Sequence, residues 1–233
     1  MIQGRDVPPG DHEQAPELGW VAPEVAEEFP ELRLLSVALD ARPGPSPRPI
    51  RERLRELSNR FHGAHAVTLR RDPIPSAYRI FFRHIGLDPD ATRTPAEAAA
   101  LDRLLHGGFR SRNLLDDALL LALVDTGIPI WALDAQTVEG PLGIRLSRRG
   151  EALGRFPDAP RLPGGRLVVC DEGGPVAILF GELAPRHGVS PQTTSMALFS
   201  VQVAGVPSIH VEEALWTCST LLSYPGPEAE SRW

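Results

Sequence analysis

Hydrophobic and polar residues follow two different periods along this chain, and the change falls near residue 127. Before it, apolar residues recur at the spacing of amphipathic helices. After it, short apolar or alternating runs are separated by Gly, Pro and Asp turns, which is typical of strands. Helices in the first half and a mostly antiparallel, layered sheet in the second half predict an α+β fold without a repeated βαβ unit.

Five segments are predicted to be helices, most of them from their caps. Ser76 is expected to cap the second, and Thr94 with Pro95 and Glu97 forms a capping box for the third. The predicted helices span residues 50–60, 77–85, 95–106, 114–125 and 208–222. The inner face expected for the last one consists of Ile209, Ala214, Leu215, Cys218 and Leu222.

The strand pattern sets the expected domain boundaries. Strands are predicted over residues 32–39, 129–133, 143–147, 166–170, 175–180 and 196–203. The polar, Pro- and Gly-containing N-terminal segment is expected to be flexible. We therefore predict a flexible arm over residues 1–24, a single domain over 25–222 and a flexible tail over 223–233.

Charge is distributed unevenly. All 24 basic residues are arginines, and the formal net charge is -6. Residues 1–46 carry -6, residues 47–112 carry +6, and residues 113–233 carry -6. A basic segment on an acidic protein suits a binder of one polyanion at one face, because arginine neutralises phosphates locally. The alternative is that these arginines lie on solvated helix faces, partly paired with acids.

Several classes of chemistry lack sequence support. The chain has no GxSxG, HExxH or Walker motif, and the neighbouring His62 and His65 have no third ligand nearby, so neither a metal nor a cofactor is expected. Cys170 and Cys218 are expected to be buried thiols. No apolar run is long enough to span a membrane, and no signal peptide is apparent. A cytoplasmic protein is therefore expected, with its oligomeric state open.

Three carboxylates follow predicted strands and are candidates for polar chemistry. Asp134 and Asp171 occupy positions that also suit turn residues, so both interpretations stay open. Glu182 follows Gly181 in a corner, where an acid can orient water or accept a hydrogen bond from an ammonium group. It is the candidate catalytic residue.

The order of motifs resembles the B3/B4 domain of the phenylalanyl-tRNA synthetase beta subunit, and most closely its stand-alone versions. The likeness covers about residues 30–222 and rests on five runs. These are the run that begins SAYRIFFRHIGLD at Ser76, RNLLDDALLLALVDTGIPIWALD ending at Asp134, EGPLGIRLSRRGE from Glu139, LVVCD from Leu167, and the Thr193–Thr194 turn.

The resemblance implies a layered α+β editing domain that hydrolyses mischarged aminoacyl-tRNA with a positioned water rather than a covalent nucleophile. Residues that match the family pattern are Asn113, Asp117, Gly127, Pro129, Ala132, Gly181 and Glu182. The chain departs from that pattern at Leu119 and Leu120, which replace a polar pair, and at Trp131, which replaces a histidine. An indole cannot accept a proton as imidazole does.

These observations lead to a tRNA- or aminoacyl-tRNA-binding protein, with trans-editing of mischarged aminoacyl-tRNA as a possible activity. The alternative is a binder of small, amino-acid-like molecules that reuses the cleft without catalysis. The expected ligand-binding cleft consists of Asn113, Asp117, Leu120, Trp131, Gly181 and Thr194, with Glu182 as the catalytic residue. The arginines expected to contact RNA phosphates are Arg79, Arg83, Arg110 and Arg112.

Overall fold

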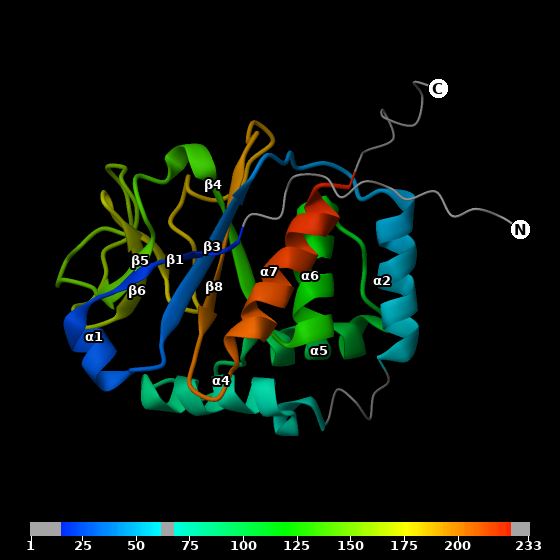
Figure 1. The fold of residues 1–233 in the computed structure, drawn as a ribbon, viewed down its shortest axis with the longest axis horizontal. Helices are drawn as coiled ribbons and strands as arrows, with labels where there is room; N and C mark the ends of the chain where they lie inside the picture. The colour runs from blue at the N-terminus through cyan, green and yellow to red at the C-terminus, as the bar shows by residue number, and fades with distance from the viewer. Residues whose placement is uncertain (1–14, 62–67, 225–233) are drawn as a thin grey trace, which may run out of the picture.

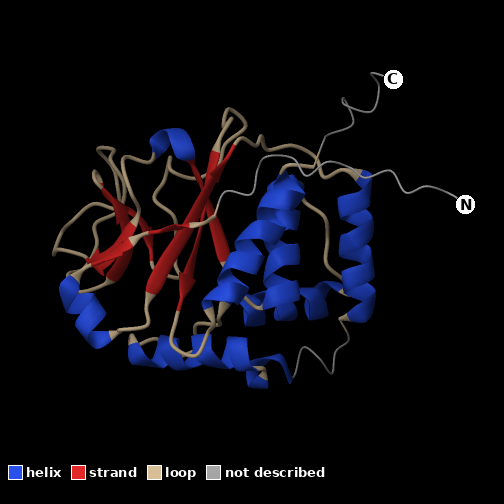
Figure 2. Cartoon of the chain, viewed as in Figure 1, coloured by secondary structure: helices blue, strands red, loops and turns tan. Residues whose placement is uncertain are grey.

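Two four-stranded sheets and a group of helices form the part of the chain that the computed structural model describes, residues 15–61 and 68–224. The first sheet lies in the middle of the molecule, between the second sheet and most of the helices (Figures 1 and 2). This arrangement confirms the predicted α+β class. His62 and His65 lie outside the described residues.

The first sheet has the strand order β1-β3-β8-β4, and all neighbours are antiparallel. Its strands are β1 (Glu17–Leu18), β3 (Arg33–Leu39), β8 (Met196–Gln202) and β4 (Ile130–Asp134). Val37 pairs with Leu198, whereas Trp131 pairs with Phe199. Because cross-strand partners point to the same face and neighbours along a strand to opposite faces, these two pairs lie on opposite faces of the sheet.

The second sheet has the order β2-β5-β6-β7. It contains β2 (Trp20–Val21), β5 (Gly143–Leu146), β6 (Leu167–Asp171) and β7 (Gly174–Ile178). Strands β2 and β5 are parallel, and the other neighbours are antiparallel. All five residues of β6 are buried, consistent with its central place in this sheet.

Gly19 carries the chain from the first sheet to the second. Its N–H donates to the Leu34 carbonyl at 2.8 Å, and the next N–H, that of Trp20, donates to the Leu142 carbonyl at 3.2 Å. A Cβ at Gly19 would lie 2.5 Å from the Leu142 oxygen and 2.8 Å from a methyl group of Leu34. Only glycine allows this approach without a shift of the neighbouring backbone. Strands β1 and β2, on either side of Gly19, lie within residues 1–24, the segment that was expected to be a flexible arm.

Most helices lie on one side of the first sheet, one crosses its end, and the first lies beside the second sheet (Figure 1). They are α1 (Pro23–Glu28), α2 (Arg48–Arg60), α4 (Pro73–His84), α5 (Pro95–His106), α6 (Leu114–Thr126) and α7 (Ser208–Leu222), with short 3-10 helices η1 (Leu69–Arg71) and η2 (Ala135–Thr137). Helices α6 and α7 lie side by side, and α2 lies beyond α6 (Figure 1). No described helix is long and apolar enough to cross a membrane.

Sequence and structure differ at the start of α4. The helix was expected to begin after Ser76, but it begins at Pro73 with Asp72 as the N-cap residue. Proline is tolerated in the first turn because the N–H it lacks has no partner within the helix. The capping box of α5 is present as predicted, with Thr94 and Glu97 each accepting from the other's backbone.

Both cysteines are buried and free, as predicted. Burial raises the pKa of the Cys170 thiol to about 11 and that of Cys218 to about 12. A thiol that stays protonated at neutral pH is a poor nucleophile. Their role is therefore to fill the core.

Candidate functional site

The loop between α5 and α6, residues 107–113, presents two of the predicted phosphate-binding arginines. Arg110 and Arg112 are both exposed. The Ser111 hydroxyl between them donates to the Asp117 carboxylate at 2.5 Å, and the Arg112 N–H donates to the other carboxylate oxygen at 2.9 Å. The hydrogen bonds to Asp117 therefore hold the loop at Ser111 and Arg112.

Asp117 holds this loop from inside the protein. Asp117 is only 1% exposed, and its carboxylate also accepts a 2.6 Å hydrogen bond from the Ser46 hydroxyl. The carboxylate therefore joins the proline-rich segment before α2 to the loop before α6. Sequence reasoning placed Asp117 in a ligand cleft, but its hydrogen bonds are used within the fold.

Asn113 and Leu120, two further residues predicted to line the ligand cleft, have structural roles at α6. Asn113 is the N-cap residue, and its side-chain oxygen accepts from the Asp116 N–H at 2.8 Å. Its amide nitrogen donates to the Asp116 carboxylate at 2.9 Å. Leu120 is partly buried and packs against the main core.

Arg79 and Arg83 lie one turn apart on α4 and differ in their surroundings. Arg79 is 7% exposed, and its guanidinium donates to Asp90 at 2.7 Å and to Glu97 at 2.5 Å. The hydrogen bond from Arg79 holds the pKa of the Asp90 carboxyl below its usual value. Arg83 is exposed. Arg79 thus ties α4 to the start of α5, which leaves Arg83 as the α4 residue available to a phosphate.

Trp131 lies on the face of the first sheet opposite α7, within a cluster of aromatic rings. Its ring is stacked on Phe199, with centroids 5.5 Å apart and planes 15° apart. The Phe180 ring meets it edge-on, also with a centroid distance of 5.5 Å. Phe180 in turn contacts Tyr78, Phe81 and Phe82 of α4. The indole is therefore in contact with two aromatic rings, Phe199 and Phe180.

Gly181 and Glu182 form a tight turn directly after Phe180. The Gly181 N–H donates to the Ile178 carbonyl, and the Ile178 N–H donates to the Glu182 carbonyl, both at 2.9 Å. Phe180 has a φ of +57°, which is uncommon for an aromatic residue and costs conformational energy. This backbone directs the Phe180 ring toward Trp131 while Gly181 and Glu182 remain exposed.

Thr194 lies near the end of β4, where Asp134 organises the neighbouring loops. The Thr194 hydroxyl accepts from the Gln136 amide at 3.3 Å. Asp134 accepts from the Gln136 N–H at 3.0 Å and from the Thr193 hydroxyl at 2.6 Å. Asp134 therefore acts as a turn residue, one of the two interpretations that the sequence left open.

The structure divides the predicted site into separate regions. Trp131, Gly181 and Glu182 are brought close through Phe180, whereas Asp117 lies in the helical layer beyond the opposite face of the sheet. Ser46 and Ser111, whose hydroxyls both donate to the Asp117 carboxylate, were not identified from the sequence. No local sequence signal could find Ser46, because it lies 71 residues from Asp117.

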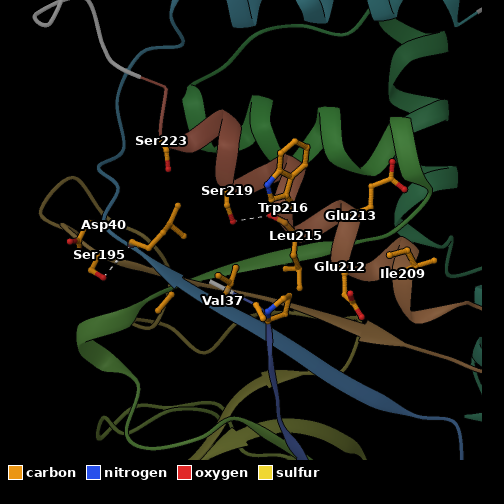
Figure 3. Close-up of a pocket in the computed structure, with 14 residues that line it drawn as sticks. Val37, Asp40, Ser195, Ile209, Glu212, Glu213, Leu215, Trp216, Ser219 and Ser223 are labelled. Carbon is orange, nitrogen blue, oxygen red and sulfur yellow. Dashed lines mark hydrogen bonds between the residues drawn. The ribbon is translucent and has the colours of Figure 1, made fainter. Parts of the chain in front are cut away.

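A groove that the sequence did not predict lies between α7 and β3, on the helix side of the first sheet. It has a volume of about 1400 Å³. Val37 and Leu215 form part of its apolar lining, and Asp40 and Glu212 lie on its sides (Figure 3). Ile209 was expected on the inner face of α7 but is 62% exposed here. Ile209 lies nine residues before buried Cys218, and this spacing places the two residues on opposite sides of the helix.

Comparison with known proteins decides the family. The B3/4 domain model matches residues 77–213, more than half of the chain. The chain belongs to the B3/4 domain family. A phenylalanine–tRNA ligase beta subunit from Xylella fastidiosa (strain Temecula1) is 41% identical over 86 residues, which is 37% of this chain and 10% of that protein.

A second relative extends the matched region. The phenylalanine–tRNA ligase beta subunit of Xanthomonas euvesicatoria pv. vesicatoria is 36% identical over 122 residues, covering 51% of this chain and 15% of that protein. This B3/4 domain chain therefore spans only a small part of the curated relatives that it matches. The recognised likeness and the α+β fold agree with the predicted family.

Proposed function

We propose that this B3/4 domain protein binds tRNA or aminoacyl-tRNA, with Arg110, Arg112 and Arg83 in contact with phosphates. The observation that carries the proposal is the exposed pair Arg110 and Arg112 on a loop anchored by buried Asp117. The relatives support it, since they are subunits of a tRNA ligase.

The anchored loop supplies what phosphate binding needs. Guanidinium groups form charge-assisted, often bidentate hydrogen bonds with phosphate oxygens. A backbone held in place before binding loses less conformational entropy when the complex forms. The net charge of -6 limits indiscriminate attraction of nucleic acid to the rest of the surface.

The binding proposal is tested with fluorescently labelled tRNA specific for phenylalanine. In about 0.1 M salt, the double variant Arg110→Ala/Arg112→Ala is expected to bind about tenfold more weakly than wild type, because two phosphate contacts are lost. Arg149→Ala is the control, since Arg149 is exposed but lies outside the basic segment. Equal affinity of the double variant and wild type would contradict the assignment of these arginines.

Hydrolysis of mischarged aminoacyl-tRNA is a second candidate function, favoured by the turn at Phe180–Glu182. Strained backbone recurs at functional sites, and here it precedes an exposed carboxylate that could orient a water molecule. A small molecule stacking on Trp131 would instead have to displace Phe180 or Phe199 from its ring. Editing is therefore preferred to the small-molecule alternative.

The editing function is tested with phenylalanine tRNA charged with tyrosine. If Glu182 positions the attacking water, Glu182→Ala lowers the deacylation rate about a hundredfold or more, while tRNA affinity stays within about twofold. Glu172→Ala is a control at another exposed acid, in the turn between β6 and β7. Deacylation no faster than in buffer by the wild-type protein would remove this function and leave the binding proposal intact.

A further inference from the structure

The groove between α7 and β3 leaves part of the first sheet without a helical cover. Val37 and Leu39, on the helix side of β3, are only half-buried, although their partners Leu198 and Met196 on β8 are buried completely. Helix α7 therefore covers β8 well and β3 incompletely (Figure 1). An element lying beside α7, over β3, would complete this layer.

Helix α7 exposes two large apolar side chains at the groove, where a surface helix is usually polar. Ile209 is 62% exposed and Trp216 is 60% exposed, seven residues apart and hence on one face of the helix. Figure 3 shows Trp216, Glu213 and Ile209 along α7 and Val37 on the strand across from them. Large apolar side chains gathered at a groove mark binding surfaces more often than scattered ones do.

Charge defines what could fill this groove. The described part of its lining contains Asp40, Glu212 and Glu213 but no arginine or histidine. Of these three carboxylates, only Glu213 has an ion-pair partner among the described residues, His210 at 3.5 Å, and that pair requires a protonated histidine. A cationic occupant gains from these carboxylates, and an arginine can also stack on Trp216. RNA would be repelled here.

Size favours a helix over a small molecule. Groove residues run along α7 from Ile209 to Ser223, which corresponds to about 21 Å of helix. A helix about 10 Å wide and of that length fills about 1600 Å³. The groove holds about 1400 Å³, whereas small-molecule sites hold about 300–1000 Å³.

We propose that this groove docks a basic amphipathic helix of a partner protein, with its apolar side on Val37, Ile209 and Trp216 and its arginines or lysines facing Asp40, Glu212 and Glu213. The basic helix α2 of a second copy does not suit the groove, because the residues of its apolar side, Ile50, Leu54 and Leu57, are buried. The chain segments before residue 15 and after residue 224 carry more acids than arginines.

The test uses the full chain and three labelled peptides of 18 residues. The first is an amphipathic helix of leucine and arginine, the second replaces arginine by glutamate, and the third scrambles the first. Binding of the first peptide alone is expected. Glu212→Arg/Glu213→Arg and Trp216→Ala are each expected to weaken that binding at least about tenfold, through repulsion and through loss of the apolar contact.

The matched control is Glu24→Arg/Glu27→Arg, which makes the same change in net charge at two exposed positions of α1. It is expected to change the peptide affinity by less than about twofold, since screening limits long-range effects. Equal weakening by both double variants would show nonspecific attraction and overturn the proposal. So would equal binding of the scrambled peptide, dimerisation that Trp216→Ala abolishes, or absence of binding. Loss of tRNA binding leaves this proposal unaffected.

Discussion

Asp117 connects the fold to the candidate site at the scale of a single residue. Its buried carboxylate accepts hydrogen bonds from Ser46, Ser111 and the Arg112 N–H. It therefore acts as a positioning residue for the loop that presents Arg110 and Arg112. The likeness to an editing domain marks this aspartate in the sequence, but only the structure shows which groups it holds.

Asp117→Ala is expected to lower the free energy of unfolding by about 3 kcal/mol, because it leaves the buried Ser46 hydroxyl and two partly buried donors, the Ser111 hydroxyl and the Arg112 N–H, without their acceptor. It should also weaken tRNA binding as the arginine loop loosens. The measurement is urea unfolding, followed by tRNA titration under conditions where the variant stays folded. Asp116→Ala is the control, since Asp116 is exposed and its side chain bonds Asn113. Equal losses in the two variants would contradict this role.

The ion pair of Glu151 with Arg145 is expected to make the free energy of unfolding depend on pH. The Arg145 guanidinium donates to it at 2.5 and 2.9 Å, and this hydrogen bond lowers the pKa of the Glu151 carboxyl. A carboxyl whose pKa is lower in the folded state stabilises the fold above its unfolded pKa, and this contribution is lost as pH falls through the folded pKa. The ion pair is expected to contribute about 1 kcal/mol at neutral pH.

Urea unfolding between pH 3 and pH 7 checks this expectation. Glu151→Gln should be less stable than wild type at pH 7, and the difference should shrink as pH falls toward 3, because protonation of the carboxyl in the unfolded state removes the advantage of the charged form in the folded state. Glu172→Gln, at an exposed acid, is the control. A constant difference across this pH range would assign the effect of Glu151 to packing rather than charge.

At the scale of elements, local signals found most helices and strands. Strand β3 and helix α7 lie within a residue of their expected bounds, and the α5 capping box depends on residues three apart. Strands β1 and β2 were missed because two-residue strands show no alternation. Such strands exist through pairing with distant partners, which a local pattern cannot reveal.

The candidate site was harder to predict because it depends on register and on long-range contacts. Trp131 was recognised as a departure from the family pattern, but its stacking on Phe199 follows from the pairing of β4 with β8. Arg79 and Arg83 look alike in sequence, and only the positions of Asp90 and Glu97 distinguish them. Charge along the chain therefore identified the basic segment but not which arginines are free.

The passage of the chain between the two sheets gives a prediction at this scale. Gly19→Ala is expected to destabilise the protein by about 1–3 kcal/mol, because the added methyl group would overlap the Leu142 carbonyl and Leu34. Gly44→Ala is the control, since a Cβ at Gly44 has no heavy atom within 4 Å. Thermal unfolding compares the two. Equal melting temperatures would mean that β1 and β2 do not cross between the sheets as described.

At the scale of the whole molecule, charge separates two surfaces with different proposed partners. The basic segment includes the anchored arginine loop, while the groove beside α7 is lined by carboxylates and large apolar side chains. The net charge of -6 conceals this division. The proposed partner of the arginine loop is tRNA, and the proposed partner of the acidic groove is a basic helix.

The salt dependence of tRNA binding tests the central claim most directly. If Arg83, Arg110 and Arg112 each neutralise a phosphate, the logarithm of the association constant should fall with the logarithm of salt concentration with a slope of about -2 to -3. Replacing all three by alanine should remove most of that slope, whereas Arg149→Ala should leave it nearly unchanged. A wild-type slope near zero, or one that the triple variant retains, would contradict binding of tRNA through these arginines.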